Sequence, residues 1–277
     1  MSTTKMGSQG FKWFLGVVED LEDPLKLGRM RVRVFQEHDE QIDTKALQWA
    51  IAVMPVTSAS LTGVGVSPTG MAVGSYVVGF YLDGDEKQFP MIVGTWHKIP
   101  DMDDSKHDVS ALAREKQIIT KTPLGPEPAS AYAAKYPFNI VTQTASGHTI
   151  EMDDTPGQER LHVYHKSGSY VEINKDGRIV TKSADEMLTI VTKDDTVYVK
   201  GNGKVTIEGN NSITVNGNAS LTVGGNLTST VKGKATVSVT GNLSATVKGS
   251  ADVKSTGNMN VTSSKNVNIK GSRINLN

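Results

Sequence analysis

The sequence contains no cysteine, few aromatic residues and no excess of either charge. Aromatic residues make up 6% of its 277 residues, and 29 basic residues balance 29 acidic ones. Without cysteine, neither a disulfide framework nor a thiolate metal site is available. No apolar run approaches the length of a membrane-spanning helix, and no N-terminal segment resembles a signal peptide. We therefore expect a soluble protein that is made in the cytoplasm and carries no metal and no other cofactor.

An eight-residue phrase is repeated from Val197 to Asn277. This period is shorter than that of helical-pair or propeller repeats, which need about twenty residues or more. Within each repeat, apolar residues stand two apart, as on one face of a strand, and a glycine supplies the backbone freedom for a corner. The pattern predicts a strand, a corner and another strand. The predicted corner residues, most of them followed by Asn, are Gly201, Gly209, Gly217, Gly225, Gly233, Gly241, Gly249 and Gly257.

One such chain cannot form a core by itself. Each repeat offers only two or three small inward side chains, and a lone winding strand leaves its backbone edges unpaired. We expect three chains to wind together as a homotrimer around a narrow apolar axis, because the strict register argues against the alternative of a flexible low-complexity tail. The predicted trimer core comprises Val205, Ile207, Ile213, Val215, Leu221, Val223, Val231, Val237, Val239 and Val247. Ser255 and Ser263 are polar candidates for inward positions.

The sequence pattern of residues 9–96 predicts a compact β domain. Arg31 and Arg33 alternate with apolar residues between Met30 and Val34, and loops rich in glycine, serine and proline separate about five short strands. This arrangement favours a small Greek-key barrel of the OB type. Acidic residues outnumber basic ones up to Lys98, and the Trp and Phe residues fall within apolar strand patterns. We therefore assign these aromatic side chains to the core and expect no nucleic-acid binding.

Several phrases resemble a known family. WFLGVVEDLEDPLKLGRMRVRV, MPVTSASLTGVGVSPTG and YVVGFYLDGDEKQFPMIVGTW are similar to the OB domain of the central spike proteins of T-even-like contractile-tail phages, and more loosely to VgrG proteins of type VI secretion. SGHTIEMDDTPGQERLHVYHKSGSYVEINKDG resembles the segment that leads into the spike β-helix in both families. The resemblance implies an all-β chain: an N-terminal OB-fold barrel in residues 1–97, a linker in 98–137, a segment leading into the β-helix in 138–196, and an intertwined triple-stranded β-helix in 197–277.

The T-even central spike carries a lysozyme domain where this chain has only residues 98–137. That interval is too short for a cleft with two carboxylates across a sugar, so we expect no enzyme activity. We expect one short helix around Val109 to Ile118 and otherwise a linker. The triplet ending at His148, and the pair His162 and His165, lack the partners of a catalytic or metal site. We interpret three nearby acids as solvated charges around a turn: Asp153, Asp154 and Glu159.

The resemblance also implies a function. It implies a structural spike in the virion tail baseplate that punctures the host outer membrane on sheath contraction. It implies a separate trimeric hub protein at the OB end and a PAAR-type tip protein at the C-terminus, seated on Ile274, Asn275, Leu276 and Asn277. The absence of a fused hub favours this reading over the alternative, a VgrG-like secretion spike that carries effectors. The repeats are basic, since Glu208 and Asp252 are their only acids, which suits an approach to anionic lipopolysaccharide.

Overall fold

A computed structural model describes residues 10–97 and 127–275 of the chain. The helix expected around Val109 to Ile118 and the proposed tip residues Leu276 and Asn277 lie outside these ranges. The chain separates into two units, Met1–Thr196 and Val197–Asn277. Every regular element longer than three residues in the described ranges is a β-strand, as the sequence predicts.

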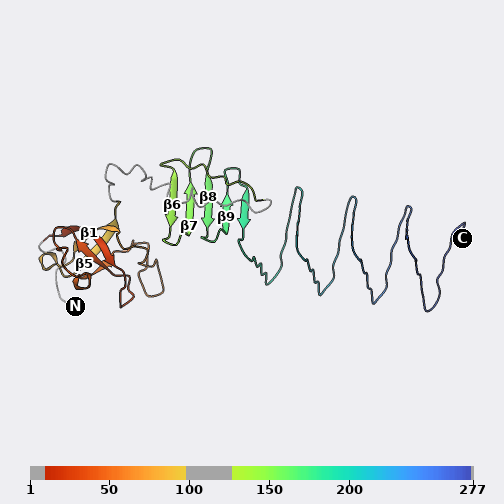
Figure 1. The fold of residues 1–277 in the computed structure, drawn as a ribbon, viewed down its shortest axis with the longest axis horizontal. Helices are drawn as coiled ribbons and strands as arrows, with labels where there is room; N and C mark the ends of the chain where they lie inside the picture. The colour runs from red at the N-terminus through yellow and green to blue at the C-terminus, as the bar shows by residue number, and fades with distance from the viewer. Residues whose placement is uncertain (1–9, 98–126, 276–277) are drawn as a thin grey trace. The chain divides into compact units, whose positions relative to one another are not determined.

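The first five strands form a closed barrel (Figure 1). They are β1 (Lys12–Asp20), β2 (Met30–Val34), β3 (Trp49–Ala52), β4 (Tyr76–Tyr81) and β5 (Pro90–Thr95), with the short 3-10 helices η1 (Thr44–Ala46) and η2 (Gly84–Glu86) between them. The strand order is β1-β2-β3-β5-β4, and β3 pairs with β5 in parallel while the other pairs are antiparallel. This closed five-stranded sheet confirms the predicted OB-type barrel.

Alternate residues of the barrel strands fill its core. Phe14, Val18, Met30 and Ile92 are each at most 5% exposed. Gly79 lets two strands approach closely here, because a Cβ at this position would collide with the carbonyl oxygen of Met91 and the ring of Phe14. The core is therefore a set of small and branched side chains packed around few aromatic rings.

The assignment of all Trp and Phe residues of this domain to the core is wrong. Trp13 is 61% exposed and Phe11 is 47% exposed. Successive residues of a strand point to opposite faces, so the side chain of Phe14 enters the barrel while its neighbour Trp13 lies outside. Both outer rings contact Phe80, with ring centroids at 5.3 Å from Phe11 and 5.5 Å from Trp13.

The next five strands form a separate antiparallel meander. They are β6 (Asn139–Gln143), β7 (Thr149–Asp153), β8 (Arg160–Tyr164), β9 (Tyr170–Ile173) and β10 (Ile179–Lys182). Each strand pairs with the one before it, so that they lie side by side in sequence order (Figure 1). Short turns join the strands. The turns 144–148 and 165–169 therefore lie at one end of the strands, and the turns 154–159 and 174–178 lie at the opposite end.

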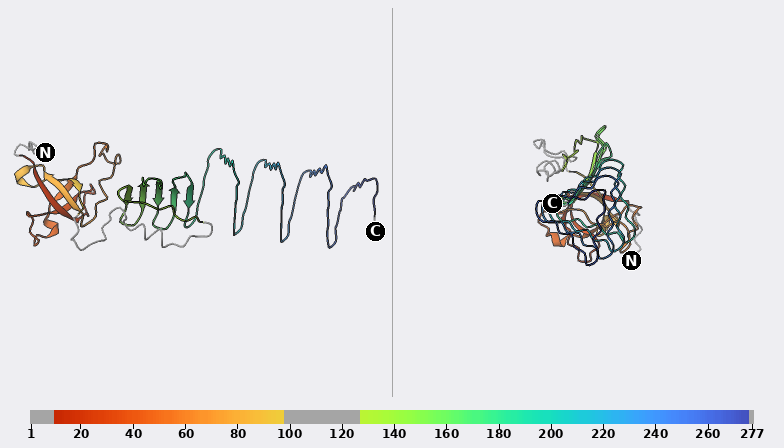
Figure 2. Two further views of the ribbon diagram at one scale, coloured as in Figure 1. Left: turned by 90° about the horizontal axis from the view of Figure 1, so that it is seen from above. Right: turned by 90° about the vertical axis from the view of Figure 1, so that its right-hand side faces the viewer.

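From Ser183 to Asn275 the described chain is extended and bends at a regular interval. Bends recur every eight residues, first at Ala184–Asp185 and then at every predicted corner glycine up to Gly257. The structural period thus begins before Val197, where the glycine repeat becomes visible in the sequence. Figure 2 shows residues 197–275 as a series of open coils.

The corner glycines do not owe their place to a left-handed backbone. None of the eight, from Gly201 to Gly257, has a positive φ, and a Cβ added to any of them would meet nothing within 4 Å. A positive φ is therefore not the reason for glycine at these bends in this conformation. Lys265 occupies the same bend position without glycine.

Candidate functional site

The repeats present a regular apolar stripe that one chain leaves uncovered. In most repeats an apolar residue stands three positions before the bend and is largely exposed, as Val205 is at 87%. The residue just before the bend is about half exposed, as Ile207 is at 50%. Both positions belong to the predicted trimer core, and the same alternation continues through Val237 and Val239. Exposed apolar surface of this extent marks an interaction surface.

The backbone of this region is equally unpartnered within one chain. Among the described residues from Asp185 to Asn275, no backbone-to-backbone hydrogen bond is formed. Extended segments with free N–H and C=O groups are templates for pairing with other strands. A Cβ added at the corner glycines would meet no atom of another coil of the same chain within 4 Å.

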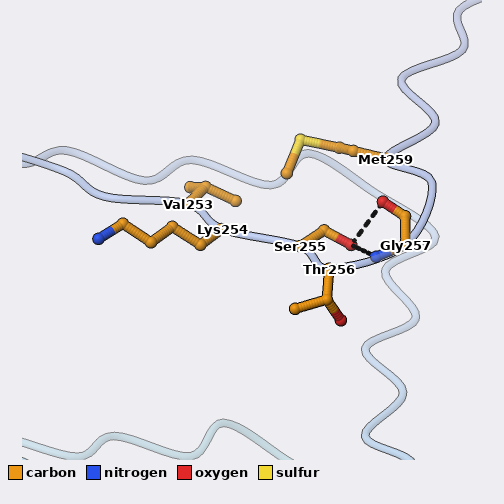
Figure 3. A pocket seen from close by; sticks show the side chains of 6 residues that line it. All are labelled: Val253, Lys254, Ser255, Thr256, Gly257 and Met259. Carbon is orange, nitrogen blue, oxygen red and sulfur yellow. Dashed lines mark hydrogen bonds between the residues drawn. The ribbon is translucent and has the colours of Figure 1, made fainter.

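Two serines replace the apolar residue that precedes the bend near the end of the repeats. Ser255 Oγ donates to the carbonyl of Gly257 at 3.1 Å and accepts from its N–H at 3.3 Å (Figure 3). Ser263 Oγ accepts from the N–H of Lys265 at 3.1 Å. In Figure 3, Val253 and Met259 lie on one side of this bend and Thr256 on the other, beside a hollow of about 540 Å³. The hydroxyls of Ser255 and Ser263 therefore stabilise the bends at 256–257 and 264–265 by local hydrogen bonds.

The five-stranded sheet also has one uncovered apolar face. Its apolar side chains alternate with buried polar ones and are between 41% and 64% exposed; they are Ile140, Ile150, Met152, Leu161, Val163, Val171 and Ile179. An antiparallel sheet in water normally buries its apolar face and exposes its polar one. Here the arrangement is inverted, which a single chain does not explain.

The polar face of the sheet holds a buried charge network. Arg160 donates to both Glu151 and Glu172, and the second bond is 2.8 Å long. Asn139 donates to Glu151 at 2.9 Å, and His162 stacks on Tyr164. All of these residues are at most 8% exposed. Buried charges of this kind are stable only when paired and hydrogen-bonded.

An extended segment, residues 127–138, here called the strap, covers this polar face. At its start, Glu127 accepts hydrogen bonds from Tyr170 at 2.9 Å and from Lys182 at 2.6 Å. Further along, Tyr132 stacks on the guanidinium of Arg160, and the N–H of Lys135 donates to Thr155 at 2.9 Å. Burial, together with the bond to Glu127, raises the pKa of Tyr170 to about 12.

The sequence-predicted polar residues of this region fall in three places. His162 is buried under the strap and His165 is exposed in a turn, which confirms that the two do not share a face. Asp153 is 2% exposed and accepts from the N–H of Thr155 at 2.9 Å, so its interpretation as a solvated charge is wrong. Asp154 and Glu159 are exposed. Hydrogen bonds from the backbone N–H groups of Glu159 and Gly157 lower the pKa of Glu159.

His148 and His165 form a pair that the sequence analysis did not find. Their ring centroids are 4.5 Å apart, because His148 directly precedes Thr149 and His165 directly follows Tyr164, and Thr149 and Tyr164 are paired at the ends of β7 and β8. The antiparallel register between the two strands was the signal that could have revealed them. Among the described residues, no group of three or more His, Asp or Glu side chains is placed to hold a metal ion.

The barrel carries a further exposed apolar stripe on its outer surface. Trp13 and Leu15 of β1, Ile51 of β3 and Val93 of β5 are each between 47% and 61% exposed. The register pairs Trp13 with Phe80, Leu15 with Val78 and Ile51 with Met91, so the stripe is continuous over four strands. At the other end of the chain, Ile274 is 49% exposed. No helix of the described part is long and apolar enough to cross a membrane.

Two family models match the chain. The Gp5 N-terminal OB domain matches residues 32–115, and the bacteriophage T4 gp5 C-terminal trimerisation domain matches residues 142–247 and 178–274. The second model thus covers both the sheet with the uncovered apolar face and the region of regular bends. Neither model describes a lysozyme domain.

Two curated relatives agree with these matches. Protein Gp5 of Vibrio phage KVP40 is 32% identical over 274 residues, which cover 74% of this chain and 65% of that protein. The pre-baseplate central spike protein Gp5 of Enterobacteria phage T4 is 43% identical over 100 residues, which cover 33% of this chain and 17% of that protein. The chain therefore spans less than two thirds of the length of either relative.

Proposed function

The chain belongs to the Gp5 family of phage tail central spike proteins, components of the virion baseplate, and from this premise we propose that it forms the trimeric shaft that punctures the host outer membrane. The proposal has three parts: the trimer contacts, the mechanical role, and the partners at the two ends.

The observation that carries the proposal is the pair of uncovered features in residues 184–275. The apolar stripe recurs every eight residues, and the backbone between the bends has no partner within the chain. Two further copies lying between the coils would satisfy both at once. In this arrangement the trimer core consists of the side chains predicted from the sequence, from Val205 to Val247, together with Val191 and Val199 of the earlier coils.

A shaft of this kind suits axial thrust. Each chain's backbone groups would be bonded to neighbouring chains along the whole length, and each bond contributes about 1 kcal/mol net. Failure under load would require many such bonds to break together. The basic surface of the repeats, with Glu208 and Asp252 as the only acids after Val197, favours contact with an anionic outer membrane.

The two ends of the chain are proposed to bind other proteins. The exposed stripe of Trp13, Leu15, Ile51 and Val93 on the barrel would seat a separate trimeric hub, since exposed aromatic residues are typical anchors of interfaces. The last residues, Ile274 to Asn277, would seat a PAAR-type tip protein. We also propose that the chain has no enzymatic role, because the matched families are structural and residues 98–137 are too few for a lysozyme cleft.

The test is the mass of the purified full chain by light scattering, with and without SDS at room temperature. We expect three times 29.7 kDa, and a species that survives SDS because its strands are shared between chains. A monomer would contradict the trimeric shaft. A trimer that dissociates at once in SDS would contradict the continuous cross-bonding on which the mechanical role depends.

A further inference from the structure

The two rows of turns at the ends of the strands differ in charge at the level of β7 and β8. The turns 144–148 and 165–169 contain His148, His165 and Lys166 and no acidic residue. At the opposite ends of the strands, the turn 154–159 contains Asp154 and Glu159 and no basic residue, whereas the later turn 174–178 contains Lys175, Asp176 and Arg178. All of these side chains are exposed except His148, which is half-buried. The rows lie at opposite ends of the strands, so within one chain they are separated by a strand length of about 16 Å.

A trimer brings these two rows together. This step rests on the proposed trimer, in which the apolar faces of three sheets meet at the axis. The strands then run around the axis, and the turns lie at the three corners between neighbouring copies. Threefold assembly is heterologous, so that each copy presents a different surface to each neighbour. Every corner therefore joins the turns 144–148 and 165–169 of one copy to the turns 154–159 and 174–178 of the next.

The heights of the turns make the contact specific. His148 lies at the level of β7 and His165 at the level of β8, with their rings 4.5 Å apart. The turn 154–159, which connects β7 to β8, lies between these two levels. A rotation about the axis keeps every residue at its own height. The acidic turn of one copy therefore arrives opposite the histidine pair of its neighbour.

We propose that each corner of the trimer is an intersubunit docking site in which His148, His165 and Lys166 of one copy receive the Asp154–Glu159 turn of a second copy. Opposite charges at such a rim give specificity more than affinity. The site would fix the order of the copies around the axis and prevent two like edges from meeting. It would thus set the register before the longer coiled region winds.

Disulfide trapping tests this directly, because the chain contains no natural cysteine. The full-length double variant Asp154→Cys/His165→Cys is oxidised and analysed by denaturing electrophoresis without reductant, after boiling. We expect a covalent trimer, since each of the three corners would carry one bond. A bond within one chain is excluded, because a disulfide needs Cα atoms within about 7 Å. Glu159→Cys/Lys166→Cys samples the same corner with a neighbouring pair.

The controls separate this inference from the proposed function. Each single cysteine variant should remain uncrosslinked, and His148→Cys/His165→Cys should form a bond within the chain only, since these residues are adjacent. Light scattering of every variant reports trimer formation independently. A trimer in which neither double variant crosslinks would overturn the docking site and leave the trimeric shaft intact. Covalent dimers from a single variant would show that like edges meet, which also overturns it. A monomer before oxidation would overturn both.

Discussion

Arg160 on β8 donates to Glu172 on β9 at 2.8 Å, and the two side chains are buried on the polar face of the sheet. The buried face of this sheet is thus its charged one, and the face left open is apolar. The strap seals the charged face from within the same chain. The apolar face has no cover of its own, so assembly with other copies completes the sheet.

Removing the cation from this network should be strongly destabilising. Arg160→Leu would leave Glu151 and Glu172 buried without a counter-charge, and breaking a buried pair in this way costs about 3–5 kcal/mol. We expect that loss in the free energy of unfolding, measured by urea denaturation at fixed protein concentration. Arg178→Leu is the matched control, because Arg178 is exposed in a turn of the same sheet. Equal effects of the two changes would show that the network contributes nothing.

An amide side chain in the middle of the apolar stripe of the repeats should weaken the trimer. Val215→Asn places an amide in the proposed core of all three chains, where burial of each Val contributes about 1.5–3 kcal/mol. We expect the trimer to lose its resistance to SDS at room temperature. Electrophoresis of unboiled samples measures this loss. Thr214→Asn changes the neighbouring residue on the other face of the strand and should leave that resistance unchanged. Loss of resistance in both variants would contradict the assignment of the core face.

The corner glycines offer a test of close packing between chains. A Cβ at Gly241 meets nothing within one chain, so Gly241→Val should not strain an isolated coil by contact. In the trimer, however, we expect it to separate neighbouring backbones and to lower the melting temperature of the assembly by several degrees or more. Lys265→Val is the control, because that bend is formed without glycine. An unchanged melting temperature in Gly241→Val would mean that no chain approaches the corner.

Sequence patterns predict the features of the fold that repeat or alternate along the chain. The strands of the barrel follow from patterns such as Met30 to Val34, and the eight-residue glycine spacing predicts the bends. Local patterns could not show that Trp13 lies outside the barrel, because Trp13 and Phe14 are adjacent aromatic residues on β1 and only the closure of the sheet decides which of them faces inward. The burial of Asp153 depends on the strap, which joins residues far apart in the chain. The glycine repeat begins at Val197, whereas the bends begin at Ala184, where no glycine marks them.

The attachment of the strap can be followed through Tyr170. The phenol donates to Glu127 at 2.9 Å, and burial with this bond raises the pKa of Tyr170 to about 12, against about 10 for a free tyrosine. A folded-state pKa above the unfolded one contributes stability that is complete below about pH 10 and is lost as the pH rises through about 12. In a titration of tyrosinate absorbance against pH, Glu127→Gln should therefore lower the pKa of one tyrosine, Tyr170.

The same variant should detach the strap before the rest of the chain unfolds, because it also removes the negative charge that pairs with Lys182. We expect faster amide hydrogen exchange in residues 127–136, with no change in the barrel. Glu208→Gln, an exposed acid in the repeats, controls for the loss of one negative charge. If Glu127→Gln titrates like the unaltered protein, Tyr170 does not owe its pKa to the strap, and the strap is held by its backbone contacts to Glu172 and Thr155 instead.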